Sequence, residues 1–242
     1  MTTMEYLKDG ARKLGLHLNP VQLERFYIYY RELLDWNQRM NLTSITNFKD
    51  VQIKHFLDSL TVTLALGQAT KDNKLHFIDI GTGAGMPTLP IKIAFPSVKL
   101  VLLEATAKKT AFLAHLKQKL GLDDVEIVTG RAEEVAHKSN FREQFDIVLS
   151  RAVAPLPTLV ELALPFCAIG GSFIAQKKGA IHLEISRATK AISLLGGSLR
   201  EVKRINIGEF TDERYLVIID KASPTPKQYP HRPGIPSKRP IL

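Results

Sequence analysis

The chain of 242 residues contains one cysteine, Cys167. No disulfide can form within the chain, and no Cys-x-x-Cys redox or zinc motif exists. Cys167 stands beside Phe166 in an apolar segment, so we expect a buried core thiol. This cysteine usage is typical of a protein from a reducing compartment.

Long apolar runs are also missing. The longest uncharged stretch, residues 162–176, is short and broken by Pro165 and by Gly170 and Gly171. The first ten residues lack the apolar core of a signal peptide. We therefore expect a cytoplasmic protein with no membrane span.

Acidic residues are fewer than basic ones, 24 against 33, and the formal net charge is +9. A basic protein tends to meet a polyanion, which is usually nucleic acid or an anionic membrane surface. Charge alone does not choose between these partners. Hydrophobic residues make up 45% of the chain, enough for a sizeable buried core.

The first part of the chain, residues 1–66, has a helical pattern. Asn19 followed by Pro20 is typical of a helix N-cap and its first helical position. A helical stripe of apolar residues follows, and a second helix is expected to start near Asp50. On that second helix His55, Asp58 and Ser59 share one face, where they either line a cleft or join two parts of the protein.

The central part, residues 67–220, alternates apolar runs with amphipathic segments. This alternation predicts an α/β fold with a mostly parallel sheet covered on both faces. The last two strands follow each other without a helix between them, so we expect an antiparallel pair at one edge. The expected strands are 75–80, 99–104, 125–130, 145–150, 171–176, 198–207 and 213–220; the expected helices are 87–95, 107–120, 156–167 and 182–195.

The last segment, residues 221–242, holds six of the 13 prolines, five Lys or Arg residues and no acidic residue. Such a segment cannot build a core, so we expect a basic tail that is extended or partly ordered.

Glycines are concentrated in "HFIDIGTGAGMPTLP", where Gly81, Gly83 and Gly85 follow an apolar strand that contains Asp79. Glycines after a strand allow a tight turn and a close approach of backbone to ligand. The dinucleotide pattern G-x-G-x-x-G lacks its third glycine, since position 86 is Met. The pattern D-x-G-x-G-x-G resembles instead motif I of S-adenosylmethionine-dependent methyltransferases.

Two carboxylates stand at further strand ends. Glu104 ends the second strand, where a carboxylate can accept hydrogen bonds from ribose hydroxyls; NAD sites share this feature. Ala132 and Glu133 follow the third strand, a place that commonly lies beside an adenine ring. Alternatively, Glu104 is an ordinary surface acid and Glu133 an acid favoured by a helix dipole.

Motifs for other methyl acceptors are missing. The D/N-P-P-[YFW] motif of adenine amine methylation is replaced by "SRAVAP" at 150–155, and Cys167 lacks the context of a covalent nucleophile for pyrimidine carbon 5. Guanine N7 has an exposed lone pair, so its methylation needs neither that motif nor a cysteine nucleophile. Catalysis there consists mostly of positioning the base and the methyl donor. This reasoning does not exclude methyl transfer to a ribose or to a protein.

The chain resembles the glucose-inhibited division protein B family, the bacterial 16S ribosomal RNA guanine-N7 methyltransferases. The resemblance implies a class I methyltransferase fold with an N-terminal helical extension, and in-line methyl transfer from S-adenosyl-L-methionine to N7 of a guanine in the decoding-region loop. It covers nearly the whole chain and rests on "LLDWNQRMNLTSI" (33–45), "KHFLDSL" (54–60), "IDIGTGAGMPTLPIKIAFP" (78–96), "DIVLSRAVAPL" (146–156) and "YPHRPGIPSKRPI" (229–241).

The resemblance also implies site residues. It implies that Gly81 and Met86 contact the cofactor in the glycine loop and that Glu104 binds its ribose. It also implies that Ala132 and Glu133 contact the adenine and that Arg151 is a further residue of the cofactor site. Many family members read A-L-K-G where this chain reads "AQKKG" (175–179), so either Lys177 or Lys178 takes the place of the family lysine.

The expected partner is 16S rRNA or the small ribosomal subunit, bound by a monomer without metal. Candidate RNA contacts near the strand ends are Lys177 and Lys178. In the tail, cations would neutralise phosphates and one tyrosine would stack on a base: Lys227, Tyr229, Arg232, Lys238 and Arg239. Alternatively, the tail is solvated and packs along the domain.

Two other functions stay open from the sequence. One is an S-adenosylmethionine-binding ribosome assembly factor with little catalysis. The other is an NAD-dependent oxidoreductase, against which the missing third glycine counts.

Overall fold

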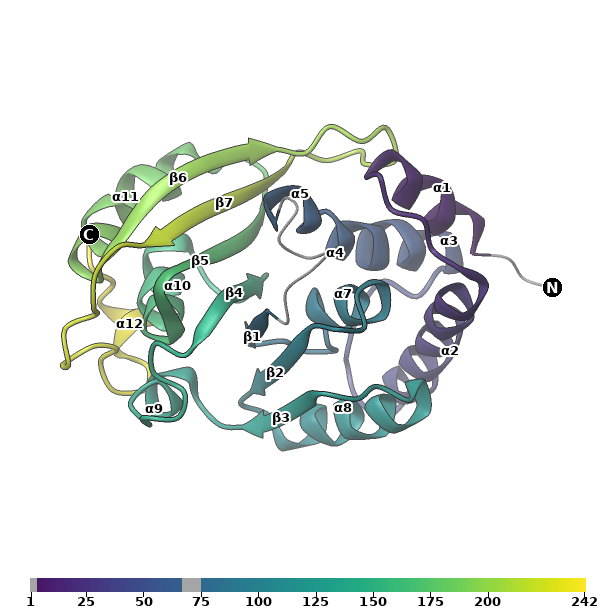
Figure 1. The fold of residues 1–242 in the computed structure, drawn as a ribbon, viewed down its shortest axis with the longest axis horizontal. Helices are drawn as coiled ribbons and strands as arrows, with labels where there is room; N and C mark the ends of the chain where they lie inside the picture. The colour runs from purple at the N-terminus through teal and green to yellow at the C-terminus, as the bar shows by residue number, and fades with distance from the viewer. Residues whose placement is uncertain (1–3, 67–74) are drawn as a thin grey trace.

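The computed structural model describes residues 4–66 and 75–242. Within these ranges it contains a seven-stranded sheet in the order β3-β2-β1-β4-β5-β7-β6. β1 to β5 are parallel, and β7 lies antiparallel to both β5 and β6 (Figure 1). The strands are β1 His76–Ile80, β2 Lys99–Glu104, β3 Val125–Thr129, β4 Phe145–Arg151, β5 Cys167–Lys178, β6 Gly197–Arg204 and β7 Arg214–Lys221. The predicted class I, Rossmann-like sheet with an antiparallel edge pair is therefore confirmed.

The N-terminal extension is helical, as predicted. Its longest helix starts at Pro20, where Asn19 and Gln22 form a reciprocal capping box. The second predicted helix starts at Phe48 and contains a π-helical segment in its middle. The elements are α1 Glu5–Lys13, α2 Pro20–Asn37, α3 Phe48–Val51, the π-helix η1 Gln52–Leu57, α4 Asp58–Leu60 and α5 Thr63–Leu66.

The remaining helices lie on the two faces of the sheet. One apolar cluster fills the space between the sheet and the extension together with α7 and α8, and it includes Phe26, Phe56, Phe77 and Phe112. The second cluster lies on the other face, under α9, α10 and α11 (Figure 1). The helices are α7 Thr88–Ala94, α8 Ala107–Leu120, α9 Ala132–Val135, α10 Leu156–Ala163, α11 His182–Leu194 and α12 Ile235–Lys238.

The predicted helix 156–167 ends early, and β5 begins early. α10 stops at Ala163, and a 3₁₀ turn with Pro165 in its first turn follows over Leu164–Phe166. Proline has no N–H for an α-helical hydrogen bond, which explains the change. Cys167 therefore starts β5, and it is buried as expected. Burial raises the pKa of its thiol to about 12, so it is a poor nucleophile.

The tail, residues 221–242, contains turns and the short helix α12 and lies along the domain. Arg142 donates to the carbonyls of Thr225 and Tyr229 at 2.9 Å each. The buried Glu161 accepts from the backbone and the ring of His231, at 2.7 and 2.9 Å. These contacts favour packing along the domain over a solvated tail. In residues 4–66 and 75–242, no helix is long and apolar enough to cross a membrane.

Candidate active site

The strand order reverses between β1 and β4, since the chain runs outward through β2 and β3 and then returns to β4. Ligands of open parallel sheets bind at such a switch point, beyond the carboxyl ends of the strands. The glycine loop follows β1 directly, and Arg151 is the last residue of β4. Both therefore lie at the edge where a ligand is expected.

The three loop glycines have left-handed backbone conformations, with φ of 68°, 60° and 93°. A Cβ on Gly81 would meet Val153 at 2.8 Å, and a Cβ on Gly85 would overlap with the side chain of Leu89. A Cβ on Gly83 would meet only the Gly81 carbonyl, at 4.0 Å. The outer two glycines are thus closely packed, while the middle one faces open space at the loop surface.

Glu104 is bound to this loop. One carboxylate oxygen accepts from the Gly83 amide at 3.0 Å and the other from the Thr106 amide at 2.9 Å. The residue is only 6% exposed. The two backbone amides orient the carboxylate beside Gly83, and each oxygen keeps a lone pair for a further donor.

Asp79 lies beneath the loop and is fully buried. Its Oδ2 accepts from the hydroxyls of Thr82 at 2.7 Å and Thr88 at 2.6 Å. Its Oδ1 has no partner among the described residues. Burial raises the pKa of this carboxyl to about 7, although the two hydroxyls oppose the shift. Asp79 therefore stabilises the loop from the buried side, through the hydroxyls of Thr82 and Thr88.

Three other expected cofactor contacts have different surroundings. Met86 is buried in the core next to the loop. Ala132 and Glu133 form the first turn of α9, after β3. Glu133 accepts from the Gly234 amide of the tail at 3.1 Å and is 9% exposed. The tail therefore reaches the place where the sequence predicts an adenine contact.

Arg151 joins β4 to the extension. Its guanidinium pairs with Asp58 at 3.1 Å and donates to the carbonyls of Lys54 and His55 and to the Ser59 hydroxyl, at 3.1 to 3.3 Å. Of the two alternatives for His55, Asp58 and Ser59, this geometry favours a polar patch that joins two parts of the protein.

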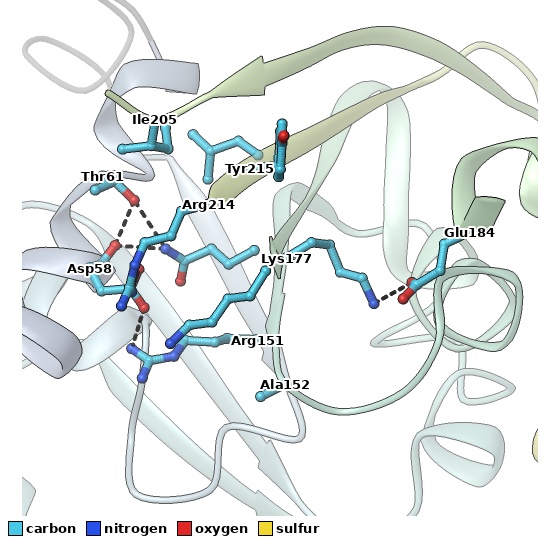
Figure 2. Close-up of a pocket in the computed structure, with 12 residues that line it drawn as sticks. Asp58, Thr61, Arg151, Ala152, Lys177, Glu184, Ile205, Arg214 and Tyr215 are labelled. Carbon is cyan, nitrogen blue, oxygen red and sulfur yellow. Dashed lines mark hydrogen bonds and ion pairs between the residues drawn. The ribbon is translucent and has the colours of Figure 1, made fainter. Parts of the chain in front are cut away.

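Asp58 has a second arginine partner. Arg214, the first residue of β7, pairs with the other Asp58 oxygen, so two guanidinium groups converge on one buried carboxylate (Figure 2). His55 completes this cluster as a neutral ring, because burial and the Arg151 charge lower its pKa to about 3. Its Nδ1 then accepts from Arg151 at 2.9 Å, and its Nε2 donates to Thr43 at 2.7 Å.

The two candidate lysines at the end of β5 lie in different environments. Lys177 is paired with Glu184 at 2.6 Å and donates to the Ala154 carbonyl, and its side chain is 12% exposed. Lys178 is half-exposed and pairs with Asp212 at 3.5 Å. Of the two, Lys178 is the more accessible to RNA.

These residues surround a pocket of about 250 Å³ at the strand ends. Its lining also includes a buried glutamine, a threonine, a tyrosine and three apolar residues. The lining residues outside the ion pairs are Thr61, Ala152, Gln176, Ile205, Tyr215 and Leu216 (Figure 2).

The four basic candidates of the tail, Lys227, Arg232, Lys238 and Arg239, are exposed. Tyr229 is half-buried. Its ring lies edge-on to the ring of His231, and the two ring centroids are 4.9 Å apart. The structure thus leaves the tail cations at the surface while it ties the tail backbone to the domain.

Sequence reasoning missed several residues of this site. Thr82 and Thr88 lie in the quoted loop, but no pattern says that their hydroxyls turn back to Asp79. Gln176 and Arg214 come from distant segments and carry no local signal. Among residues 4–66 and 75–242, no three His, Cys, Asp or Glu residues are placed to hold a metal ion.

Two of the solved structures with a similar fold are named as methyltransferases. An O-methyltransferase from Bacillus cereus in complex with SAH has a TM-score of 0.55 at 19% identity and covers 80% of this chain and 90% of that chain. A precorrin-6y C5,15-methyltransferase from Geobacter metallireducens has a TM-score of 0.52 at 14% identity and covers 75% of this chain and 92% of that chain. The fold is that of the class I methyltransferases.

The family is shown by sequence. A family profile described as rRNA small subunit methyltransferase G matches residues 22–214. A protein named Ribosomal RNA small subunit methyltransferase G from Dehalococcoides mccartyi is 51% identical over 239 residues, covering 99% of this chain and 100% of the relative. One of the same name from Alkaliphilus metalliredigens is 45% identical and covers both chains fully. The chain belongs to this family, as the resemblance predicts.

Proposed function

We propose that this protein transfers a methyl group from S-adenosyl-L-methionine to N7 of a guanine in the decoding-region loop of 16S rRNA, in the cytoplasm. The full-length similarity to ribosomal RNA small subunit methyltransferases carries the proposal. The glycine loop at the switch point supports it, because the space at Gly83 is open and the carboxylate of Glu104 is oriented beside it.

The residues present fit the cofactor. The open space at Gly83 lets a ligand approach the backbone, and Glu104 offers oriented oxygens for ribose hydroxyls. We assign the cofactor site to the glycine loop and the ends of β2, β3 and β4. Its residues are Asp79, Gly81, Gly83, Gly85, Met86, Glu104, Ala132, Glu133 and Arg151.

S-adenosyl-L-methionine supplies an electrophilic methyl group when it is bound. Guanine N7 has a lone pair and no proton, so the protein need not supply a base. Its own contribution is to hold two reactants in line and to exclude water. The buried Asp79 and the tightly packed Gly81 and Gly85 suit this task, because they fix the loop backbone.

The test is methyl transfer from radiolabelled cofactor to small subunits taken from a strain that lacks this gene and from its parent. We expect label only in the deficient subunits, recovered as 7-methylguanosine after nuclease digestion. Tight cofactor binding without label in either sample would contradict the proposal and favour an assembly factor with little catalysis.

A second experiment tests the site. Glu104→Ala removes the oxygens assigned to the ribose. Charged hydrogen bonds of this kind are worth about 1.5–3 kcal/mol, so the Kd for S-adenosylhomocysteine should rise roughly 10- to 100-fold in calorimetry. Glu126→Ala, on the exposed side of β3, is the control and should bind as the wild type does. Unchanged binding by Glu104→Ala would overturn the ribose assignment.

A further inference from the structure

The loop of residues 152–155 follows β4, which lies between β1 and β5 in the sheet. Ala152 has a left-handed φ of 56°, a conformation that residues with a Cβ rarely adopt without support from their surroundings. The next residue, Val153, packs against Gly81 and is still 39% exposed. The loop therefore presents an apolar side chain at the surface, directly beside the glycine loop.

Two side chains of opposite charge hold this loop. Lys177, near the end of β5, donates to the Ala154 carbonyl at 3.1 Å. Glu184, in the first turn of α11, accepts from the Leu156 amide at 2.9 Å. The two side chains also pair with each other at 2.6 Å (Figure 2). One ion pair thus fixes the backbone at two points, within the loop and at the start of α10.

Lys177 is poorly placed to bind an RNA phosphate. Its side chain is 12% exposed, and its ammonium already donates to the Glu184 carboxylate and to the Ala154 carbonyl. The neighbouring Lys178 is 47% exposed and makes a longer contact, of 3.5 Å, to Asp212. The contacts of Lys177 therefore serve the loop rather than a partner in solution.

The loop lies on the side of the glycine loop that the assigned cofactor contacts leave free. Glu104, Ala132 and Glu133 follow β2 or β3, and both of these strands lie on one side of β1. The loop 152–155 follows β4, on the other side of β1. A methyl acceptor that attacks in line cannot share the space of the cofactor, so it approaches from the side of β4.

We propose that Lys177 and Glu184 are positioning residues for methyl transfer, because their ion pair holds the loop 152–155 where Val153 supports the acceptor base beside the methyl donor. This inference rests on the proposed function and deepens it on the acceptor side. Neither charged side chain touches a reactant, and both act through the loop backbone. Since transfer to a lone-pair nitrogen depends on placement, a shift of about 1 Å in the acceptor can slow it about 100-fold.

The first test uses the opposite charges of the pair. Lys177→Met and Glu184→Leu both release the loop, so each should lower the single-turnover rate constant of methyl transfer to saturating unmethylated small subunits, by about tenfold or more. The Kd values for small subunits and for S-adenosylhomocysteine should stay within about twofold of the wild type. If Lys177 contacted a phosphate, Lys177→Met would instead weaken subunit binding and its salt dependence, whereas Glu184→Leu would strengthen binding.

Further variants separate positioning from a purely structural role. Lys177→Arg keeps donors for both partners and should retain most of the rate constant. Arg204→Met breaks an exposed ion pair with Glu213 and is the control, with an unchanged rate constant. The double variant of Lys177→Met with Glu184→Leu should be little slower than either single variant, because the two residues act as one unit. If Glu184→Leu does not fold, Glu184→Gln takes its place; it keeps an acceptor for the Leu156 amide but loses the charge, so we expect a several-fold loss.

The outcomes separate this inference from the proposed function. If the wild type transfers no methyl group to RNA, the proposed function fails, and the inference fails with it. If the wild type is active and the folded variants of Lys177 and Glu184 keep its rate constant, the pair only stabilises the fold and the inference alone is wrong. Opposite effects of the two variants on subunit binding would assign Lys177 to RNA, and loss of S-adenosylhomocysteine binding would assign the loop to the cofactor. Either result would overturn the inference.

Discussion

The hydroxyl of Tyr29 donates to the carbonyl of Ala84 at 2.5 Å. Tyr29 lies in α2 of the extension and is fully buried, whereas Ala84 lies between the second and third glycines of the loop. The N-terminal helices therefore hold the glycine loop directly, through one side chain that crosses from the extension to the ligand edge.

Tyr29→Phe should loosen the glycine loop. The variant keeps the ring packing against Phe56 but removes the hydrogen bond, so we expect a loss of about 1 kcal/mol in the free energy of unfolding. Affinity for S-adenosylhomocysteine should fall several-fold. Urea denaturation and calorimetry measure the two effects. Tyr30→Phe is the matched control, because its hydroxyl makes only an exposed contact of 3.5 Å to Thr46. Equal behaviour of the two variants would contradict this role for Tyr29.

Alanine substitutions should separate the ligand-facing glycine from the packing glycines. Gly83→Ala and the control Gly121→Ala place a Cβ at similar left-handed φ in open space, so each should cost about 1–2 kcal/mol of stability. Only Gly83→Ala should weaken S-adenosylhomocysteine binding, by roughly tenfold or more.

Gly85→Ala should destabilise more than either, by about 1–3 kcal/mol beyond the backbone strain, because its Cβ meets Leu89 and Tyr29. Thermal unfolding and calorimetry on all three variants give the comparison. If Gly83→Ala binds the ligand as Gly121→Ala does, the loop is not the cofactor site.

Asp79 should make stability depend on pH. The folded carboxyl keeps its proton up to about pH 7, whereas the unfolded one loses it near 3.8. Between these values the folded state binds more protons, so this residue makes the free energy of unfolding fall as pH rises, and its effect levels off above about pH 7.

Asp79→Asn removes that titration and retains an acceptor for the two threonine hydroxyls. The stability of the variant relative to the wild type should therefore rise between pH 5 and pH 7 and stay constant above about pH 8. Urea unfolding at several pH values measures this difference. Two parallel curves over the whole range would show that Asp79 titrates normally.

The exposed tail cations should contribute to RNA affinity through counterion release. Arg232→Gln combined with Lys238→Gln should weaken binding to small subunits and lower the salt dependence, with a slope reduced by about 0.7–0.9 for each phosphate that is no longer neutralised. The control pair is Lys99→Gln with Lys119→Gln. Both control lysines are exposed, and Lys99 lies at the amino end of β2, away from the ligand edge. Equal effects from the two pairs would leave the tail no specific part in RNA binding.

The sequence predicted the fold well for those elements whose structure is determined by residues close together in the chain. β2 and α8 begin and end at the predicted residues, because an apolar run and an amphipathic helix ending at Gly121 each carry their own signals. The early end of α10 was missed although Pro165 marks it. The apolar periodicity continues past that residue and conceals the break.

The site was predicted less completely, because its partners are far apart in the chain. Glu104 and the glycines were found from their places after strands. The partner of Lys177 could not be found in this way, since Glu184 lies in the next helix and only the folded chain brings the two together. The same applies to Glu133, which accepts from Gly234 more than 100 residues away.

Asp58 and its two arginines also limit how this sequence can evolve. Loss of Asp58 leaves two neighbouring guanidinium groups without the carboxylate that they share, at a cost of about 3–5 kcal/mol, whereas loss of one arginine leaves Asp58 paired with the other. Such a cost is a large share of the roughly 5–15 kcal/mol that stabilises a domain. Replacement of Asp58 alone is therefore disfavoured. Related sequences should keep Asp58 wherever they keep both arginines.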